Sequence, residues 1–355
     1  MNGLSLFASA GIGETYLSDV GINVVVANEL IERRAALYRV LNPNSNMICG
    51  DITNPQVFNC VIESAAKKNI QFMIASPPCQ GMSVAGKNRH QASMQGDERN
   101  YLINYVFKAI RLLKPKYILI ENVPMLLKFC LPYHNKNYKV LEILQREFSD
   151  LYDMDGQVMN AADYGVPQNR LRAIIKMVRK GNQWPWPLTV DHHVTVREAI
   201  GNLPSLEAGE ASNIKWHYAR NHAERQILWM KHTATGKSAF SNPIYYPKKK
   251  DGTRVKGYES SYRRIRWDEP SPTITIRNDA ISSQRNVHPG RKQLDGTYSD
   301  ARVLTPYELM ILDSLPPDWP IPDDTPEILV RQVIGESIPP LMIKKIVGEI
   351  QCLKR

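Results

Sequence analysis

The stretch Phe72-Met73-Ile74-Ala75-Ser76-Pro77-Pro78-Cys79 contains the features that decide the fold. Its first four residues form a short apolar run typical of a buried strand, and the two prolines fix φ and prevent the strand from continuing. The Cys79 thiol is therefore presented just beyond a strand end. Ligands of open α/β sheets bind at that edge, which favours a nucleophile, although a lone cysteine is more often buried and inert.

The first half of the chain alternates short β-branched runs with segments of helical periodicity. We expect strands at residues 3–8, 22–27, 47–49, 72–75 and 117–120, and helices at residues 29–41, 55–67 and 101–113. Repeated βαβ units imply an α/β fold with a parallel sheet and helices on both faces. Two later apolar runs, residues 156–160 and 173–178, are expected to complete this sheet.

The composition changes after Gly181, which indicates a second, smaller domain. The segment Trp184-Pro185-Trp186-Pro187 is followed by a stretch rich in Lys, Arg, His, Tyr and Pro that extends to about Gly296. A helical apolar pattern returns at residues 340–352. We therefore expect a first domain at 1–183, a second at 184–327, and a segment 328–355 that packs back on the first.

Charge and cysteine content limit the class of protein. The 355-residue chain has 45 Lys and Arg against 35 Asp and Glu, a net charge of +10, which favours a polyanionic partner. The cysteines are odd in number and outside any CxxC pair, which argues against a disulfide framework or a metal site: Cys49, Cys60, Cys79, Cys130 and Cys352. Because no apolar stretch approaches membrane-spanning length and Met1–Leu4 begins no leader, we expect a cytoplasmic protein without a membrane partner.

Three loops at successive strand ends suit a nucleoside. The stretch from Leu6 to Gly13 is a strand that runs into small residues, which allow a tight turn and a close approach of the backbone to a ligand. Glu29 ends the second strand, where a carboxylate can bind a ribose diol, and Asp51 follows the third, where it can accept from an exocyclic amine. Each signal alone is also typical of a plain turn or a helix cap. The absence of a third glycine disfavours a dinucleotide site.

A carboxylate and two arginines could supply the chemistry. Glu121 directly follows the strand at 117–120, at the same sheet edge as Cys79, and could transfer a proton to a ring nitrogen. Arg170 and Arg172 precede the run at 173–178, and alternation along an extended segment would put them on one face to bind a carbonyl oxygen or a phosphate. A structural ion pair and a solvated strand edge are the alternatives.

These motifs together resemble, in order, those of the DNA cytosine-5 methyltransferases, over nearly the whole chain. The matching segments are Phe7-Ala8-Ser9-Ala10-Gly11, Pro77-Pro78-Cys79-Gln80, Glu121-Asn122-Val123, Gln168-Asn169-Arg170-Leu171-Arg172, Arg302-Val303-Leu304-Thr305-Pro306-Tyr307-Glu308 and Gly335-Glu336-Ser337-Ile338-Pro339-Pro340. The resemblance implies a Rossmann-like S-adenosylmethionine domain, a smaller target-recognition domain and a cleft for double-stranded DNA.

The resemblance also implies residue roles in methyl transfer to C5 of a flipped cytosine in a specific DNA sequence. Cys79 would attack cytosine C6, Glu121 would bind and protonate N3, and Arg172 would donate to O2 with Arg170 beside it. The thiolate is needed because C5 is too weak a nucleophile unaided. Cofactor contacts would fall on Phe7, Gly11, Ile12, Glu29, Asp51, Ile52, Pro78, Leu102, Glu336 and Ser337.

Two residues depart from the family pattern. Ser9 stands where many members carry glycine, and still allows a tight turn. Glu336 stands where many carry asparagine, so it adds a negative charge near a sulfonium or replaces a structural hydrogen bond. The second departure weakens the expected contact role of Glu336 but not the expected reaction.

Sequence readout is expected in the basic, aromatic middle region, at residues 248–252, 262–267 and 271–277. The compact chain favours the modification half of a bacterial restriction–modification system. The partner expected in such a system is an endonuclease that acts separately. An RNA (tRNA) cytosine-5 methyltransferase and a catalytically silent DNA-binding module are the alternatives. An adenine amino-methyltransferase is disfavoured because Cys79 stands where an aromatic residue would stack on the base.

Overall fold

The computed structural model of the chain describes residues 1–78 and 98–352. They form two compact units. The first contains Met1–Asn160, Leu171–Leu188 and the chain from Ile343 onward, and the second contains Ala161–Arg170 and Thr189–Met342.

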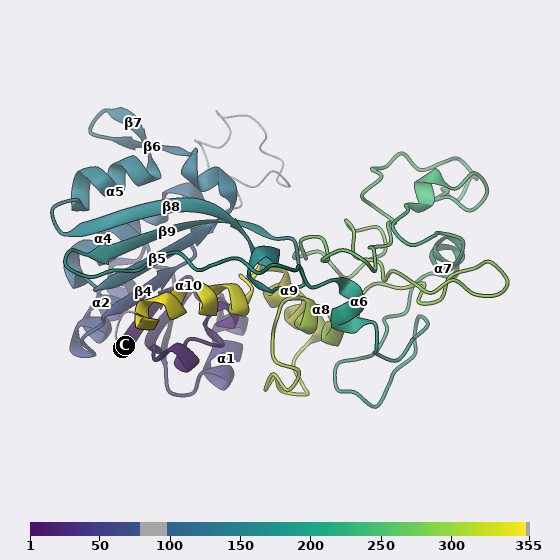
Figure 1. Cartoon of the computed structure of the whole chain (residues 1–355), viewed down its shortest axis with the longest axis horizontal. Helices are drawn as coiled ribbons and strands as arrows, with labels where there is room; N and C mark the ends of the chain where they lie inside the picture. Colours follow the sequence, from purple (N-terminus) through teal and green to yellow (C-terminus); the bar gives the residue numbers. More distant parts are fainter. Residues whose placement is uncertain (79–97, 353–355) are drawn as a thin grey trace. The chain divides into compact units, whose positions relative to one another are not determined.

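A seven-stranded sheet in the order β3-β2-β1-β4-β5-β9-β8 forms the centre of the first unit (Figure 1). The strands are β1 Asn2–Leu6, β2 Asn23–Glu29, β3 Asn46–Cys49, β4 Phe72–Ala75, β5 Tyr117–Asn122, β8 Tyr152–Asn160 and β9 Leu171–Arg179. The five strands β1 to β5 are parallel, which confirms the predicted α/β class. The strand order reverses between β1 and β4, so the carboxyl ends of these strands border the switch point where such sheets bind ligands.

The last two strands differ from the all-parallel expectation. β9 runs antiparallel to both β5 and β8. The chain leaves β8 at Asn160 and enters β9 at Leu171 after a short excursion, and a parallel pair would need a longer crossover. Apolar runs predicted both strands, but a run contains no information on direction.

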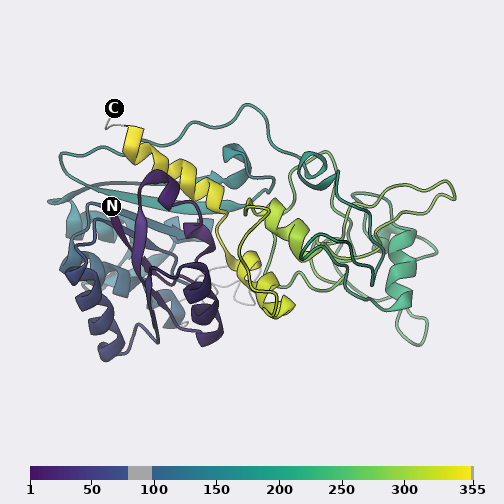
Figure 2. The same cartoon turned by 90° about the horizontal axis from the view of Figure 1, so that it is seen from below.

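Helices of the first unit pack on the sheet as their apolar periodicity predicts. They are α1 Glu32–Leu41, α2 Pro55–Lys67, α4 Ile103–Leu113, α5 Val140–Phe148 and α10 Pro340–Cys352. The first three residues of α10 belong to the second unit. One hydrophobic cluster joins α2, α4 and α5 to the strands, and α1 packs in a separate cluster through Ala35 and Tyr38. Lys344 of α10 pairs with Asp19 at 2.6 Å, which places this helix beside the loop after β1 (Figure 2).

A two-stranded hairpin between β5 and α5 was not predicted. It consists of β6 Cys130–Tyr133 and β7 Lys136–Lys139. The turn residues His134 and Asn135 both have positive φ, 46° and 63°, as a two-residue hairpin turn requires.

The second unit has little regular structure. Its helices are α6 Val196–Ile200, α7 Glu224–Lys231, α8 Pro306–Leu312 and α9 Glu327–Glu336. Short 3₁₀ turns in the two units are η1 Ile12–Glu14, η2 Ser18–Val20, η3 Glu98–Tyr101, η4 Pro124–Leu127, η5 Ala161–Tyr164 and η6 Ala239–Ser241. A small apolar core around Trp229, Met230 and Val303 supports the loops.

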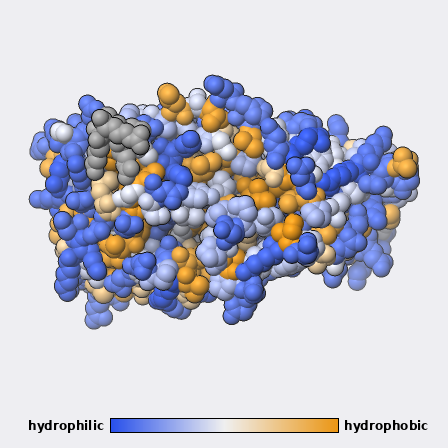
Figure 3. All heavy atoms as spheres, turned by 60° about the horizontal axis from the view of Figure 1, so that its bottom comes forward, coloured by the Kyte–Doolittle hydropathy of each residue, from blue (hydrophilic) through white to orange (hydrophobic). Residues whose placement is uncertain are grey.

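The unit boundaries differ from the predicted domains in two places. Residues 161–170 and 328–342 belong to the second unit, whereas both were expected with the first. The change in composition near Trp184, where the domain boundary was expected, lies close to the observed division after Leu188. On the surface shown in Figure 3, hydrophobic side chains lie in small groups among hydrophilic ones. Within the described residues, no helix is long and apolar enough to cross a membrane.

Candidate active site

The loop after β1 curls tightly at the carboxyl edge of the sheet. Phe7, Ser9 and Gly11 have positive φ angles of 60°, 48° and 78°. A Cβ on Gly11 would lie 2.8 Å from the ring of Tyr38 and 2.7 Å from the Asn42 side chain, so only glycine fits. Ile12, which follows, is buried. Ser9 holds its left-handed angle, as the expected tight turn requires.

Glu29 joins this loop to the end of β2. Its Oε2 accepts from the Ser9 amide at 2.8 Å and its Oε1 accepts from the Ile31 amide at 2.9 Å. The side chain is only 7% exposed, and Arg34 lies 3.9 Å from Oε1. Two backbone donors therefore orient the carboxylate, and each of its oxygens can accept a further hydrogen bond, as a ribose diol would require.

Asp51 presents a second oriented carboxylate after β3. Its Oδ1 accepts from both the amide and the hydroxyl of Thr53 at 2.8 Å, and the residue is exposed. Its neighbour Ile52 is 3% exposed and packs into the core. Carboxylates at adjacent strand ends, beside a tight loop, fit the hydroxyls and amine of an adenosine group. Leu102 precedes α4, and Pro78 is the last residue before the segment that the structure leaves undescribed.

Glu121 and Arg172 meet at the ends of β5 and β9. Arg172 Nε lies 2.8 Å from Glu121 Oε1, and the two side chains are 12% and 11% exposed. Antiparallel pairing of Glu121 with Ile174 brings Arg172, two residues earlier, to this end of the sheet. A fixed acid and a fixed guanidinium are thus joined by an ion pair near the surface, where a planar ring offering a nitrogen and a carbonyl could engage both.

Asn122 fixes the chain that leads to Cys79, and sequence reasoning missed this role. Its Nδ2 donates to the Pro77 carbonyl at 2.8 Å, and its Oδ1 accepts from the Val123 amide at 2.8 Å. The side chain is 2% exposed. The predicted nucleophile Cys79 lies outside the described residues, two positions after the carbonyl that Asn122 holds. The available signal was a polar residue directly after Glu121, at the end of the apolar run 117–120.

Arg170 has surroundings that differ from the expected face shared with Arg172. It is 1% exposed, and its guanidinium donates to the carbonyls of Ile274 at 2.6 Å, Gly335 at 3.1 Å and Ser337 at 2.5 Å. β9 begins at Leu171, so Arg170 lies outside the strand and the alternation rule does not apply to it. These contacts make Arg170 a support for the backbone of the second unit.

Glu336 and Ser337 also belong to the second unit. Glu336 ends α9, and the Ser337 hydroxyl has two acceptors for its one proton, Asp313 Oδ2 at 2.6 Å and the Ile334 carbonyl at 2.8 Å. The Ser337 side chain thus has internal partners, and its predicted cofactor contact stays a prediction. Among the residues described, no group of three or more His, Cys, Asp and Glu side chains could hold a metal ion.

Comparisons with known proteins identify the family. The family described as C-5 cytosine-specific DNA methylase matches residues 1–352. Type II methyltransferase M1.HgaI of Avibacterium volantium is 62% identical over 348 residues, which are 98% of this chain and 97% of the relative. Type II methyltransferase M1.HphI of Haemophilus parahaemolyticus is 29% identical over 347 residues, 97% of this chain and 84% of the relative.

A solved structure has the same fold. A DNA modification methyltransferase encoded within an E. coli prophage superposes with a TM-score of 0.71 at 19% identity, covering 100% of this chain and 99% of that chain. The Rossmann-like sheet, the strand-end carboxylates and the family match agree with one another. The chain therefore belongs to the C-5 cytosine-specific DNA methylases and is a DNA cytosine-5 methyltransferase that uses S-adenosylmethionine as its methyl donor.

Proposed function

We propose that this enzyme methylates a cytosine that is turned out of double-stranded DNA, through a covalent bond between Cys79 and C6. The observation that carries the proposal is the cluster at the end of β5. There Glu121 pairs with Arg172 at 2.8 Å, and Asn122 binds the Pro77 carbonyl, two residues before Cys79. Extrusion of the base is part of the proposal because C5 and C6 are inaccessible to a thiol while the base is stacked.

The proposed reaction uses three side chains. The Cys79 thiolate adds to C6 while Glu121 delivers a proton to N3 and Arg172 donates to O2, so that the electron-rich ring is stabilised. S-Adenosylmethionine, when bound, supplies an electrophilic methyl group for C5. The N3 proton returns to Glu121 as C5 takes the methyl group, and loss of the C5 proton to water then restores the C5–C6 double bond and expels the thiolate. Arg170 is assigned a structural role in place of a contact with the base.

The proposed cofactor site lies at the carboxyl ends of β1 to β4. Glu29 would bind the ribose and Asp51 the adenine amine. Six further residues would complete the site around them: Phe7, Gly11, Ile12, Ile52, Pro78 and Leu102. Glu336 and Ser337 are the proposed contributions of the second unit, whose Ser337 hydroxyl would have to add a ligand contact to the bonds it already makes.

The proposed biological role is the modification half of a type II restriction–modification system in the bacterial cytoplasm. The bacterial relatives support this role, because M1.HgaI and M1.HphI are both type II methyltransferases. The role implies a separate endonuclease that recognises the same sequence. Bisulfite sequencing of DNA from cells that express the enzyme would identify the target site, and protection of that DNA from a type II endonuclease would test the role.

A trapping experiment tests the mechanism. DNA with 5-fluorocytosine at the mapped site cannot lose its C5 substituent, so a denaturant-stable adduct should form with the wild-type enzyme and not with Cys79→Ser. Cys130→Ser is the matched control, because Cys130 is a half-buried cysteine on the β6–β7 hairpin. Tritiated methyl transfer should fall to background only in Cys79→Ser. Adduct formation by Cys79→Ser, or transfer that persists, would contradict the mechanism, and transfer to tRNA in preference to DNA would contradict the substrate.

A further inference from the structure

The surplus of positive charge is concentrated outside the region expected to read the DNA sequence. Residues 184–327 contain 19 Lys and Arg and 18 Asp and Glu, a surplus of one. Residues 104–147 contain eight basic and three acidic residues, a surplus of five, which is half of the chain's net +10. This segment forms α4, β5, the β6–β7 hairpin and α5 of the first unit. A local surplus of this size attracts a polyanion to the first unit itself.

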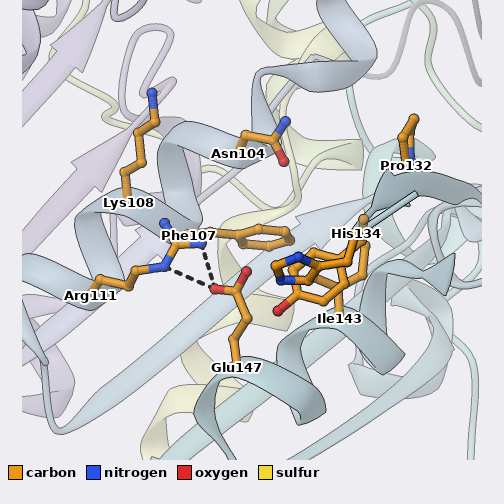
Figure 4. Close-up of a pocket in the computed structure, with 9 residues that line it drawn as sticks. Asn104, Phe107, Lys108, Arg111, Pro132, His134, Ile143 and Glu147 are labelled. Carbon is orange, nitrogen blue, oxygen red and sulfur yellow. Dashed lines mark hydrogen bonds and ion pairs between the residues drawn. The ribbon is translucent and has the colours of Figure 1, made fainter. Parts of the chain in front are cut away.

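A cavity of about 410 Å³ lies within this segment, between α4, α5 and the hairpin (Figure 4). Phe107 and Ile143, each 2% exposed, supply its apolar floor. Asn104 and Lys108 of α4 line it together with Pro132, Tyr133 and His134 of the hairpin. Its volume is in the range of about 300–1,000 Å³ that is typical of ligand sites.

The acidic residue of the cavity is neutralised within the first unit. Glu147 accepts from Arg111 Nε at 2.9 Å and from Nη2 at 2.5 Å. Figure 4 shows this pair on one side of the Phe107 ring, with His134 and Ile143 on the other. The Lys108 ammonium, 4.3 Å from the Tyr105 ring, is therefore a net positive charge at the rim. An anion that enters the cavity meets a cation whose charge Glu147 does not cancel.

The hairpin extends this positive rim. Tyr133 lines the cavity and pairs with Lys136 across the hairpin. Directly opposite residues of an antiparallel pair share a face, so Lys136 projects to the same side as Tyr133. Further exposed basic side chains occur along the segment at Lys128, Lys139 and Arg146, and the guanidinium of Arg146 lies 4.2 Å from the Tyr138 ring. Such a row of charges fits an extended polyanion better than a free nucleotide, which would need only one or two.

We propose that the cavity and its lysines bind the sugar–phosphate backbone of duplex DNA outside the target site. One phosphate would contact Lys108 and the Asn104 amide, a neighbouring phosphate would contact Lys136, and the apolar face of the deoxyribose would pack on Tyr133 and Pro132. Such contacts carry no sequence information but add affinity and fix the enzyme's register on the DNA. This inference rests on the proposed function, because it takes DNA as the substrate and adds a second contact surface for it.

The test compares two duplexes that carry the mapped target, one ending a few base pairs beyond it and one with long flanks. For Lys108→Gln/Lys136→Gln, the slope of log K against log salt on the long duplex should be about 2 smaller in magnitude than for the wild type, since each lost phosphate contact removes about 0.9. Steady-state methyl transfer to the short duplex should be unchanged. The matched control is Lys67→Gln/Lys68→Gln, which removes two exposed lysines at the end of α2.

Each result has one meaning. Equal salt slopes for the cavity variant and the wild type on the long duplex would overturn the inference, as would an equal loss in the α2 control. Loss of transfer to the short duplex would also overturn it, because the cavity would then serve the reaction itself. A wild-type enzyme that transfers no methyl group to either duplex would refute the proposed function, not this surface. Asn104→Asp, which adds a negative charge at the rim without touching the floor, should reproduce the loss with a smaller change in slope.

Discussion

Two of the buried glutamates, one in each unit, have pKa values shifted in opposite directions. Glu14 in the first unit is 8% exposed and accepts from the Tyr38 hydroxyl at 2.6 Å. Burial raises its pKa to about 7, although hydrogen bonds from Ser5 and Tyr38 oppose the shift. Glu308 in the second unit is 1% exposed. Burial alone would raise its pKa too, but the ion pair with Arg302 outweighs burial and lowers the pKa to about 2. The partner, and not the depth of burial, decides the direction in which the pKa shifts.

The difference reflects how each unit is held together. In the first unit a regular sheet connects the segments, and single hydrogen bonds fix the loops beside it, as between Tyr38 and Glu14 and between Asn122 and the Pro77 carbonyl. In the second, Arg302 bonds to Glu308 at 2.8 and 2.9 Å, to Asp300 at 3.0 Å and to the Leu206 carbonyl at 2.8 Å. These bonds connect segments that no sheet connects. An ion network therefore takes the place of regular secondary structure among the loops.

The largest effect is expected from breaking this network. Arg302→Met leaves Glu308 buried without its cation, while Asp300 keeps only Arg291 at 3.3 Å, which should destabilise the second unit by about 3–5 kcal/mol. Urea unfolding followed by tryptophan fluorescence measures the loss. The control is Arg266→Met, which removes an exposed pair with Glu269 at 3.1 Å and should cost at most about 1 kcal/mol. Equal losses in the two variants would show that the network does not hold the unit together.

Asn122 tests whether a neutral bond in the first unit serves catalysis more than stability. Asn122→Ala leaves the Pro77 carbonyl buried without its donor, a cost of about 1–3 kcal/mol, and should release the chain that leads to Cys79. We expect kcat to fall about 10- to 100-fold and the KM for S-adenosylmethionine to change less, since of the proposed cofactor contacts only Pro78 adjoins the released carbonyl. Asn23→Ala on the exposed end of β2 is the control. A fall in unfolding free energy with kcat unaltered would assign Asn122 to stability alone.

The two glutamates also predict opposite dependences on pH. Glu308 has a folded pKa below its ordinary 4.5, so its contribution is present above pH 4.5 and is lost as the pH falls towards 2. His288 adds to the loss of stability in acid. Burial lowers its pKa from 6.5 to about 3, so it stays neutral in the folded state while the unfolded chain takes up a proton below pH 6.5. Glu14 has a raised folded pKa, so its contribution is present below pH 4.5 and is lost as the pH rises through about 7.

Glu14→Gln should therefore stabilise the first unit by about 2–3 kcal/mol more at pH 8 than at pH 5, since raising the pKa from 4.5 to about 7 costs the ionised form about 1.4 kcal/mol per pKa unit. Hydrogen exchange of α1 and β2, measured at both pH values, would report this difference. A variant that is equally stabilised at both would show that the proton on Glu14 is not the cause.

Sequence patterns predicted the first unit far better than the second. Apolar runs located β4, α2 and α10 with the same bounds as the structure, because each buries a face of regular periodicity. The arginine pair shows where such reasoning stops. Alternation assumes that both residues lie in one strand, but β9 starts between Arg170 and Arg172, so one arginine meets Glu121 and the other binds carbonyls of the second unit. The start of a strand depends on tertiary packing, which one sequence does not encode locally.

The loops of the second unit were beyond prediction for a related reason. His288, Asp300, Arg302 and Glu308 are polar residues, which as a class favour the surface, yet each is at most 2% exposed. Their burial is possible only because they neutralise and hydrogen-bond one another across the fold. The motif that contains Arg302 and Glu308 was noted for its resemblance, but its ion pair depends on a capping box at Thr305 that positions Glu308 on α8.

The smallest expected effect separates the shape of Tyr38 from its hydroxyl. The ring lies against Gly11 in the curled loop, and the hydroxyl donates to Glu14. Tyr38→Phe keeps the ring, so S-adenosylmethionine affinity should be unchanged, while loss of one hydrogen bond should cost about 0.5–1.5 kcal/mol of unfolding free energy. Isothermal titration and urea unfolding measure the two quantities. Because Glu14 is neutral at pH 6, the cost there should be smaller than at pH 8, where its ionised form depends more on the lost donor. The same loss of unfolding free energy at both pH values would mean that the strength of the Tyr38–Glu14 hydrogen bond does not depend on the charge of Glu14. The difference between Glu14 and the Arg302–Glu308 pair would then be one of packing alone.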